Sequence, residues 1–320
     1  MWTCLLGLLI ISCGKQRYQD VSLEQSNSVY YWRTDLRFDS TERAFLQQYH
    51  INKVYCRYFD VVMSDDGTEP KPNATIAFTD TLPTGIELIP TVYITEDCMH
   101  KPHKDLAEKL VKRIMQMNET NHIGNIHEIQ IDCDYTSKSR ATYYQFLETI
   151  KSQLSTIHYQ LSTTIRLHQL SMPVPPVDYG VLMVYNTGDP RKWQERNPIL
   201  DYRDVYPYLS KLSQYQLPLA TAYPVYQWIR NIKNVRVEHT VEAAEIIKVK
   251  KALEQERPSL SKAIITYHLE TDNINRYKTE TYEEIYRHQP FLCIFHAHDG
   301  MLVVGHHQPL HVQHVRTEQL

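Results

Sequence analysis

The sequence predicts an α/β protein, a single (β/α)8 TIM-type barrel with a long insertion between its seventh and eighth strands. Strand-like runs alternate with helix-like runs along most of the chain, and this alternation is typical of a parallel barrel. The length of 320 residues suits one such barrel. In addition, one strand carries polar side chains near its C-terminal end, where parallel barrels place their chemistry.

The expected strands are short apolar runs bounded by turn residues, at 29–32, 53–62, 87–94, 128–134, 161–170, 179–185, 217–223 and 291–298. Helical spacing of apolar residues, or a capping residue such as Ser40, predicts helices between them at 40–50, 105–117, 139–154, 202–212 and 241–253. We therefore expect the barrel domain to cover residues 28–320. Its insertion, residues 230–290, is expected to elaborate the active end of the barrel; the alternative is a small separate domain.

The N-terminus is predicted to be a targeting segment. The apolar run at 5–11 is far shorter than the ~20 residues of a membrane span, and it ends in Ser12-Cys13-Gly14. A small residue, then Cys, then Gly after an apolar core resembles a bacterial lipoprotein signal. We expect residues 1–12 to be a signal peptide, Cys13 to be lipidated, and 13–27 to be a flexible tether that holds the protein at the cell envelope. The alternative is a buried N-terminal strand.

Composition and motifs narrow the classes of ligand. The net charge is −3 and no long basic run occurs, so nucleic acid is not an expected partner. The sequence has no GxGxxG and no Walker-type loop, and no nucleotide cofactor is therefore expected. It also has no CxxC pair, which argues against a zinc knuckle. We predict that the protein uses no cofactor.

Alternation along the strands predicts a polar barrel interior. In the strand at 128–134, Gln130, Asp132 and Asp134 share one face, and Ile129, Ile131 and Cys133 share the other. The same alternation in the other strands gives an expected interior set of Arg57, Gln130, Asp132, Asp134, Arg166 and His168.

Two interpretations of this polar set remain open. The charges could form an ion network that holds the barrel together, because buried charges require partners. Alternatively, neighbouring carboxyls could differ in protonation and support general acid/base hydrolysis. Arginines so close would lower the pKa of both carboxyls, which argues against an acid role.

Further residues are expected around the same site. Substrate contacts are predicted for Asp60, Tyr93, Tyr185, Asn186, Tyr223, Trp228 and His296, and the 23 tyrosines are compatible either with ordinary packing or with an aromatic-walled cleft that binds sugars. His296 and His298 stand two residues apart on the strand expected at 291–298. They could complete a metal site with the aspartates, or simply hydrogen-bond neighbouring strand ends.

Several segments together resemble a family of uncharacterised Gram-negative bacterial lipoproteins with a predicted glycoside-hydrolase-like barrel. The matching segments are 55–61 (YCRYFDV), 128–135 (EIQIDCDY), 163–169 (TTIRLHQ), 175–177 (PPV) and 182–186 (LMVYN). The resemblance implies the barrel and an envelope location. The strand ending in Asp132 and Asp134 also looks like the chitinase-type DxDxE pattern, but Tyr135-Thr136 stands where the catalytic Glu is expected.

These observations lead to three functional hypotheses. The first is a carbohydrate-active hydrolase, or a barrel descended from one, with Asp132 and Asp134 as acid/base or transition-state groups and the other predicted residues holding a glycan or another small polar ligand. The second is a non-catalytic glycan-binding lipoprotein. The third is a metal-dependent hydrolase that uses His296 and His298.

Overall fold

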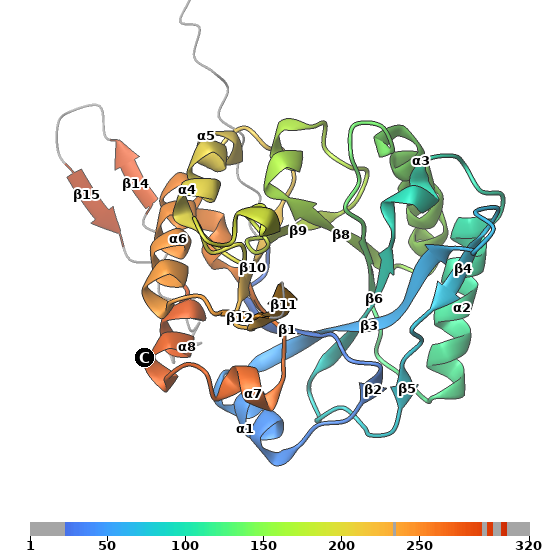
Figure 1. The fold of residues 1–320 in the computed structure, drawn as a ribbon, viewed down its shortest axis with the longest axis horizontal. Coiled ribbons are helices and arrows are strands. Elements are labelled where there is room, and N and C mark those ends of the chain that lie inside the picture. The colour runs from blue at the N-terminus through green and yellow to red at the C-terminus, as the bar shows by residue number, and fades with distance from the viewer. Residues whose placement is uncertain (1–22, 233–234, 290–292, 297–301, 306–320) are drawn as a thin grey trace, which may run out of the picture.

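The computed structural model describes residues 23–232, 235–289, 293–296 and 302–305. Eight parallel strands close into a barrel, in which β1 pairs with both the second and the last strand (Figure 1). The barrel strands are β1 (Ser26–Tyr31), β3 (Ile51–Met63), β6 (Glu87–Ile94), β7 (Glu128–Asp132), β8 (Gln160–Arg166), β9 (Tyr179–Met183), β10 (Leu219–Pro224) and β13 (Ala263–Tyr267). The predicted (β/α)8 fold is confirmed.

Helices surround the barrel, as expected for parallel strands joined by crossovers (Figure 1). They are α1 (Ser40–Gln48), α2 (Leu106–Thr120), α3 (Arg140–Ser155), α4 (Tyr202–Val205), α5 (Leu209–Leu212), α6 (Ala243–Glu256), α7 (Thr271–Ile274) and α8 (Thr279–Ile285). The 3-10 turns are η1 (Glu96–Met99), η2 (Leu167–Ser171), η3 (Pro190–Lys192), η4 (Tyr206–Tyr208) and η5 (Pro258–Ser261). Within the described ranges, no helix combines the length and the apolar character needed to cross a membrane.

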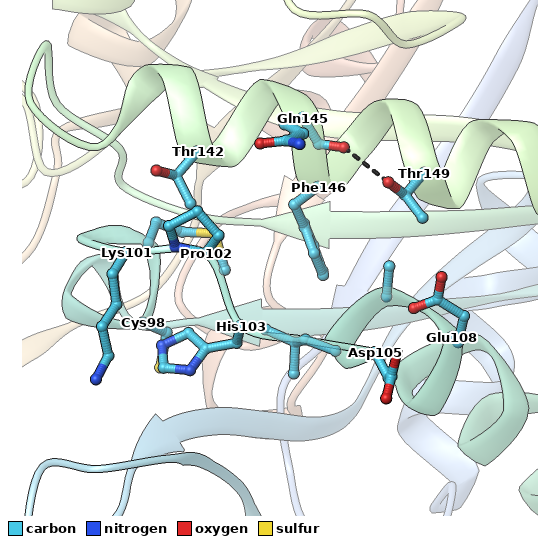
Figure 2. Close-up of a pocket in the computed structure, with 13 residues that line it drawn as sticks. Cys98, Lys101, Pro102, His103, Asp105, Glu108, Thr142, Gln145, Phe146 and Thr149 are labelled. Atoms are coloured by element: carbon cyan, nitrogen blue, oxygen red, sulfur yellow. Dashed lines mark hydrogen bonds between the residues drawn. The ribbon is translucent and has the colours of Figure 1, made fainter.

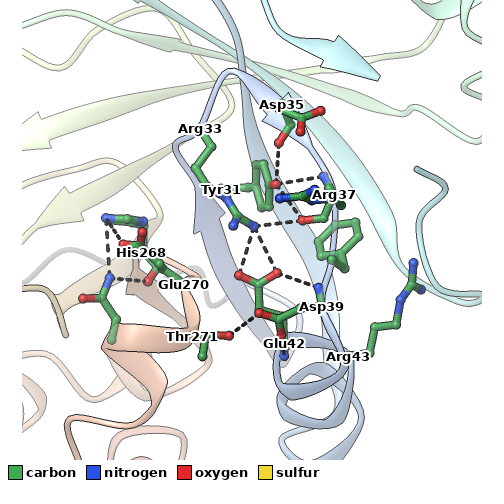
Figure 3. A network of polar contacts seen from close by, with 12 residues as sticks. Tyr31, Arg33, Asp35, Arg37, Asp39, Glu42, Arg43, His268, Glu270 and Thr271 are labelled. Atoms are coloured by element: carbon green, nitrogen blue, oxygen red, sulfur yellow. Dashed lines mark hydrogen bonds and ion pairs between the residues drawn. The ribbon is translucent and has the colours of Figure 1, made fainter. Parts of the chain in front are cut away.

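Shorter strands lie outside the eight barrel strands. They are β2 (Asp35–Leu36), paired with β5 (Ala77–Phe78); β4 (Pro70–Asn73), antiparallel to β3; and the hairpins β11 (Trp228–Ile232) with β12 (Val235–His239) and β14 (Cys293–His296) with β15 (Leu302–Gly305). The loop after β1 is tied to the start of α1 by side chains (Figure 3). There, Arg33 Nη2 donates to Glu42 Oε2 at 3.0 Å, and Asp39 and Glu42 form a capping box.

The prediction for the eighth strand is wrong. The eighth strand is β13, and β14, inside the predicted 291–298 segment, pairs only with β15 among the described strands. Both segments are apolar runs of strand length, and their composition does not distinguish them. The predicted insertion at 230–290 therefore contains a barrel strand. The segment that separates strands seven and eight holds the β11–β12 hairpin and α6 instead.

A β-bulge in β3 changes which side chains face the barrel interior. The register of β3 against β6 shifts between Arg57 and Phe59. Tyr58 donates to Asn118 of α2 at 2.8 Å, and the guanidinium of Arg113, also on α2, lies 5.0 Å from the Phe59 ring centre. Two consecutive side chains thus face the helix layer, which simple alternation along the strand does not predict.

The lower part of the barrel interior is a buried polar cluster. Glu128 accepts from Ser162 at 2.6 Å and from Tyr179 at 2.5 Å, and it lies 3.2 Å from Lys53 Nζ. Burial raises the pKa of Glu128 above its ordinary value, against the opposing effect of Lys53. These partners satisfy a carboxyl that would otherwise be costly to bury.

Gln130 belongs to this layer and not to an open site. It accepts from Tyr30 at 2.8 Å, donates to Ser162 at 3.3 Å and has no exposed surface. The prediction that Gln130 contacts substrate is therefore wrong, because the side chain is enclosed by the strands on either side of it.

Candidate functional site

The carboxyl ends of the strands form a polar and aromatic opening, which we call the mouth of the barrel. Its side chains come from β3, β6, β7, β8 and β13 and from the segments that follow β1, β7, β9 and β10. They are Trp32, Arg57, Asp60, Tyr93, Asp132, Asp134, Arg166, Tyr185, Tyr226 and Tyr267. Parallel barrels place their binding and catalytic groups at this end.

Two arginine–aspartate pairs lie in the mouth. Arg166 Nε donates to Asp134 Oδ1 at 2.5 Å, and Arg166 Nη2 lies 3.3 Å from Asp134 Oδ2. Arg57 Nε donates to Asp60 Oδ1 at 2.7 Å, and a second bond joins Arg57 Nη2 to Asp60 Oδ2. The β3 bulge makes the second pair possible, because it turns both side chains inward. The structure thus brings four predicted site residues together as two pairs.

Asp132 lies beneath these pairs, with only 4% of its surface exposed. It accepts a hydrogen bond from Thr164 Oγ1 at 2.6 Å. Burial, with a further contribution from nearby Asp134, raises its pKa to about 6, although Arg166 acts in the opposite direction. Asp132 is therefore a carboxyl that exchanges its proton close to neutral pH.

Aromatic rings form the wall of the mouth. Tyr185 stacks on Tyr267, with ring centres 4.6 Å apart, and the edge of Tyr226 packs against both rings at 6.1 and 5.5 Å. Trp32 lies 5.7 Å from Tyr267. The guanidinium of Arg166 lies 5.6 Å from the Tyr185 ring centre. Such contacts fix the rings and the arginine in position.

A hollow of about 290 Å³ opens beside Arg166. Its lining residues are Asp134, Arg166, Leu167, His168, Met183, Tyr185, Asn186, Thr187 and Tyr208. A second hollow, of about 160 Å³, lies outside the barrel between the segment joining β6 to α2 and helix α3 (Figure 2). None of the predicted site residues lines that second hollow.

His168, Asn186 and Tyr93 lie at the edge of the mouth. His168 is exposed because β8 ends at Arg166 and turns into η2, so the predicted interior position of His168 is wrong. Asn186 is also exposed and accepts from Tyr226 at 2.5 Å. Tyr93 is partly exposed, and its pKa is raised to about 12 by burial and by the nearby aspartates.

The structure places Tyr223 and Trp228 elsewhere. Tyr223 is fully buried, and Glu254 of α6 contributes to raising its pKa, so it faces the helix layer and the prediction that it lines a cleft is wrong. Trp228 lies in the β11–β12 hairpin. The guanidinium of Arg230 lies 4.4 Å from the Trp228 ring centre, and the ring centre of His239 lies 5.3 Å from it. These contacts make Trp228 part of the hairpin's own packing.

Three predicted residues cannot be placed. Cys13 and His298 lie outside the described residues, and for His296 only the backbone, in β14, is described. Over the described residues, no group of three or more His, Cys, Asp or Glu side chains is arranged to hold a metal ion.

Sequence reasoning missed Trp32, Tyr226 and Tyr267. Trp32 directly follows β1, and Tyr226 lies two residues after the end of β10. An aromatic residue just after a barrel strand is a sequence signal for a side chain at the mouth. Tyr267 was missed because its strand was assigned to the insertion.

The position expected for a chitinase-type acid holds Thr136, whose hydroxyl donates to Glu96 at 2.8 Å. Glu96 also accepts from Ser139 at 2.7 Å and lies 2.9 Å from His100 Nε2. These bonds lower the pKa of Glu96 below its ordinary value, the Ser139 bond contributing most. The carboxylate that contacts Thr136 is thus ionised and already engaged at the start of α3.

Comparison with solved structures shows glycoside hydrolase barrels of the same fold. A chitinase from Bacteroides thetaiotaomicron shares 11% identity at a TM-score of 0.55, over 82% of this chain and 97% of that chain. The spore cortex-lytic enzyme SleL of Bacillus cereus shares 16% identity at a TM-score of 0.50, over 83% and 75%. The GH18 chitinase ChiB of Flavobacterium johnsoniae shares 9% at 0.52, over 82% and 94%. No protein-family model and no curated protein matches the chain.

Proposed function

We propose that this barrel binds a glycan in its mouth without cleaving it by chitinase chemistry. The observation that supports this most is the mouth itself, where the partly exposed rings of Trp32, Tyr226 and Tyr267 stand beside two arginine–aspartate pairs. Ring faces pack against the apolar C–H surface of a sugar, and charged pairs offer fixed donors and acceptors to its hydroxyl groups. The fold shared with chitinases agrees with a glycan ligand.

The carboxyl groups around the site favour binding over cleavage. Glycoside hydrolysis requires a carboxylic acid that can protonate the leaving oxygen. Asp134 is engaged in an ion pair with Arg166. Glu96 has a lowered pKa, and Thr136 has no acidic group.

Hydrolysis is a second candidate function because of one observation. Asp132 has a pKa raised to about 6 by burial, and a carboxyl in that range can serve as a general acid. Its 4% exposure restricts its access to a bound glycosidic bond. This is the reason for ranking hydrolysis second.

The test is glycan binding measured together with product release. Tyr226→Ala removes an aromatic edge of the mouth, and Tyr159→Ala is a matched control because Tyr159 directly precedes β8, at the opposite end of the barrel. We expect Tyr226→Ala to weaken binding by about tenfold, the usual scale for losing one aromatic contact at a binding site, with Tyr159→Ala unchanged. Equal loss in both variants would show that the mouth is not the binding site.

Release of sugar by the wild type would decide between the two candidates. We expect no release from chito-oligosaccharides or peptidoglycan strands. If release occurs and disappears in Asp132→Asn, the protein is a hydrolase that uses Asp132.

We also propose that Cys13 is lipidated and anchors the protein to the cell envelope. The support is the sequence Ser12-Cys13-Gly14 after a short apolar run. Radiolabelled palmitate should be incorporated by the wild type and by Cys4→Ala, and not by Cys13→Ala. Label that persists in Cys13→Ala would contradict the proposal.

A further inference from the structure

The guanidinium of Arg166 is only partly satisfied by Asp134. Its Nε–H edge makes the short bond to that carboxylate, while the contact from Nη2 is long at 3.3 Å. Nη1 is buried and has no hydrogen-bond partner among the described residues. A buried donor without an acceptor is costly, and a charged donor especially so. Arginine can make two-point contacts with carboxylates through either edge of the guanidinium, and Asp134 occupies the Nε–Nη2 edge.

The hollow beside Arg166 is lined by further donors. Asn186 uses its Oδ1 to accept from Tyr226, so the group it can offer a ligand is the amide N–H2. Thr187 Oγ1 accepts from the Asp201 N–H at 3.3 Å, which directs its hydroxyl proton elsewhere. Tyr208 and His168 add a phenol and an imidazole to the same lining. A hollow with this lining favours a ligand group rich in acceptors.

The formal charges in the lining balance, and their arrangement decides which ligand groups they can meet. The charged side chains there are Asp134 and Arg166, with His168 as a third, titratable group. Asp134 is already paired with the Nε edge of Arg166. A cationic ligand group would face the guanidinium, whereas an anionic group would face its free edge.

We propose that the glycan bound in the mouth carries a carboxylate, and that Arg166 is the residue that selects it. This inference rests on the proposed glycan-binding function and narrows it to acidic sugars, such as uronic acids or sugars bearing an acid substituent. The carboxylate lies in the hollow and accepts from the guanidinium of Arg166. Asn186, Thr187 and Tyr208 donate to the remaining oxygens of that sugar unit.

The experiment compares a sugar acid with its methyl ester, in which the negative charges are removed. Tetragalacturonate and its methyl ester share one backbone, and calorimetry with the full chain measures both affinities, with chitotetraose as a neutral amino-sugar reference. We expect the acid to bind at least about tenfold more tightly than the ester, the scale of a hydrogen bond to a charged group. The preference should decrease with added salt.

A double variant tests the role of Arg166 while keeping the local charge balance. In Arg166→Gln/Asp134→Asn the preference for the acid over the ester should fall to less than about threefold, because the charged donor has been removed. Arg43→Gln/Asp80→Asn is the matched control, since it removes another arginine–aspartate pair, between α1 and the segment after β5. The ratio of two affinities for one protein sample does not depend on the folded fraction.

The outcomes separate this inference from the function on which it rests. Equal affinity for acid and ester, or tighter binding of chitotetraose, overturns the acidic-sugar assignment while leaving glycan binding in place. A preference that survives in Arg166→Gln/Asp134→Asn overturns the role of Arg166. If the protein binds none of the three ligands and no glycan in a broad array, both proposals are overturned together.

Discussion

Asp132 should make the folded protein less stable as the pH rises through the acidic range. Its pKa is about 6 in the fold, against an ordinary value of 3.8, and burial is the main cause. The folded state therefore binds a proton more tightly than the unfolded chain does. The stabilising effect of that proton is complete below about pH 4 and is lost as the pH rises towards 6 and above.

The size of this effect follows from the pKa difference. At about 1.4 kcal/mol per pKa unit, the difference between 3.8 and about 6 corresponds to about 3 kcal/mol of unfolding free energy. Asp132→Asn removes the titration and keeps an oxygen that can accept from Thr164, which donates to Asp132 at 2.6 Å in the wild type. We expect the variant to gain stability relative to the wild type, by up to about 3 kcal/mol, between pH 4 and pH 7.

Urea unfolding of both proteins at several pH values is the measurement. Only the difference between the two proteins is informative, because Glu128 and Glu254 also have raised pKa values and contribute equally to both pH profiles. A constant difference from pH 4 to pH 7 would refute the reasoning. A difference that changes in the opposite direction would show that Arg166 outweighs burial at Asp132.

Two further predictions test the packing around the barrel. Gly180→Ala should lower the unfolding free energy by about 1–3 kcal/mol, because the new Cβ would lie 2.7 Å from Ile165 Cγ1. Gly124→Ala is the control, since its Cβ would meet no described atom within 4 Å, and it should change the unfolding free energy little. Lys250→Met should lower the unfolding free energy by about 3–5 kcal/mol, because it leaves buried Glu254 without its ion pair. Adding Glu254→Gln should restore most of the lost stability. A double variant as unstable as the single one would contradict this reasoning.

The sequence could predict the barrel and the meeting of its charged residues. Apolar runs of strand length alternate with helical runs, and Asp132, Asp134 and Arg166 share a parity on neighbouring strands. Because the carboxyl ends of parallel strands lie at one end of a barrel, the Arg166–Asp134 pair follows from that pattern. The Arg57–Asp60 pair does not, because it depends on the bulge in β3.

The alternation of side chains along each strand does not determine which residues reach the mouth. In a parallel barrel both faces of each strand are buried, so alternation separates two faces without naming the inner one. Tyr223, for example, is predicted to line the cleft, but in the structure it faces the helix layer, near Glu254 of α6. His168 is outside the interior because Gln169 fixes the turn after β8, accepting from the Arg166 N–H at 2.8 Å and donating to the Tyr135 carbonyl at 2.9 Å. That turn depends on a contact between residues far apart in the sequence.

The difference between this barrel and a chitinase-type site extends beyond one position. Thr136 hydrogen-bonds to Glu96, and Glu96 in turn accepts from Ser139, the residue before α3. An acid placed at position 136 would meet that ionised carboxylate instead of an empty space, and like charges so close would raise the pKa of one and disturb the start of the helix. Asp134 is held by Arg166 on the other side. The side chains around position 136 are therefore already joined by hydrogen bonds and an ion pair, and a carboxylic acid there would disturb them.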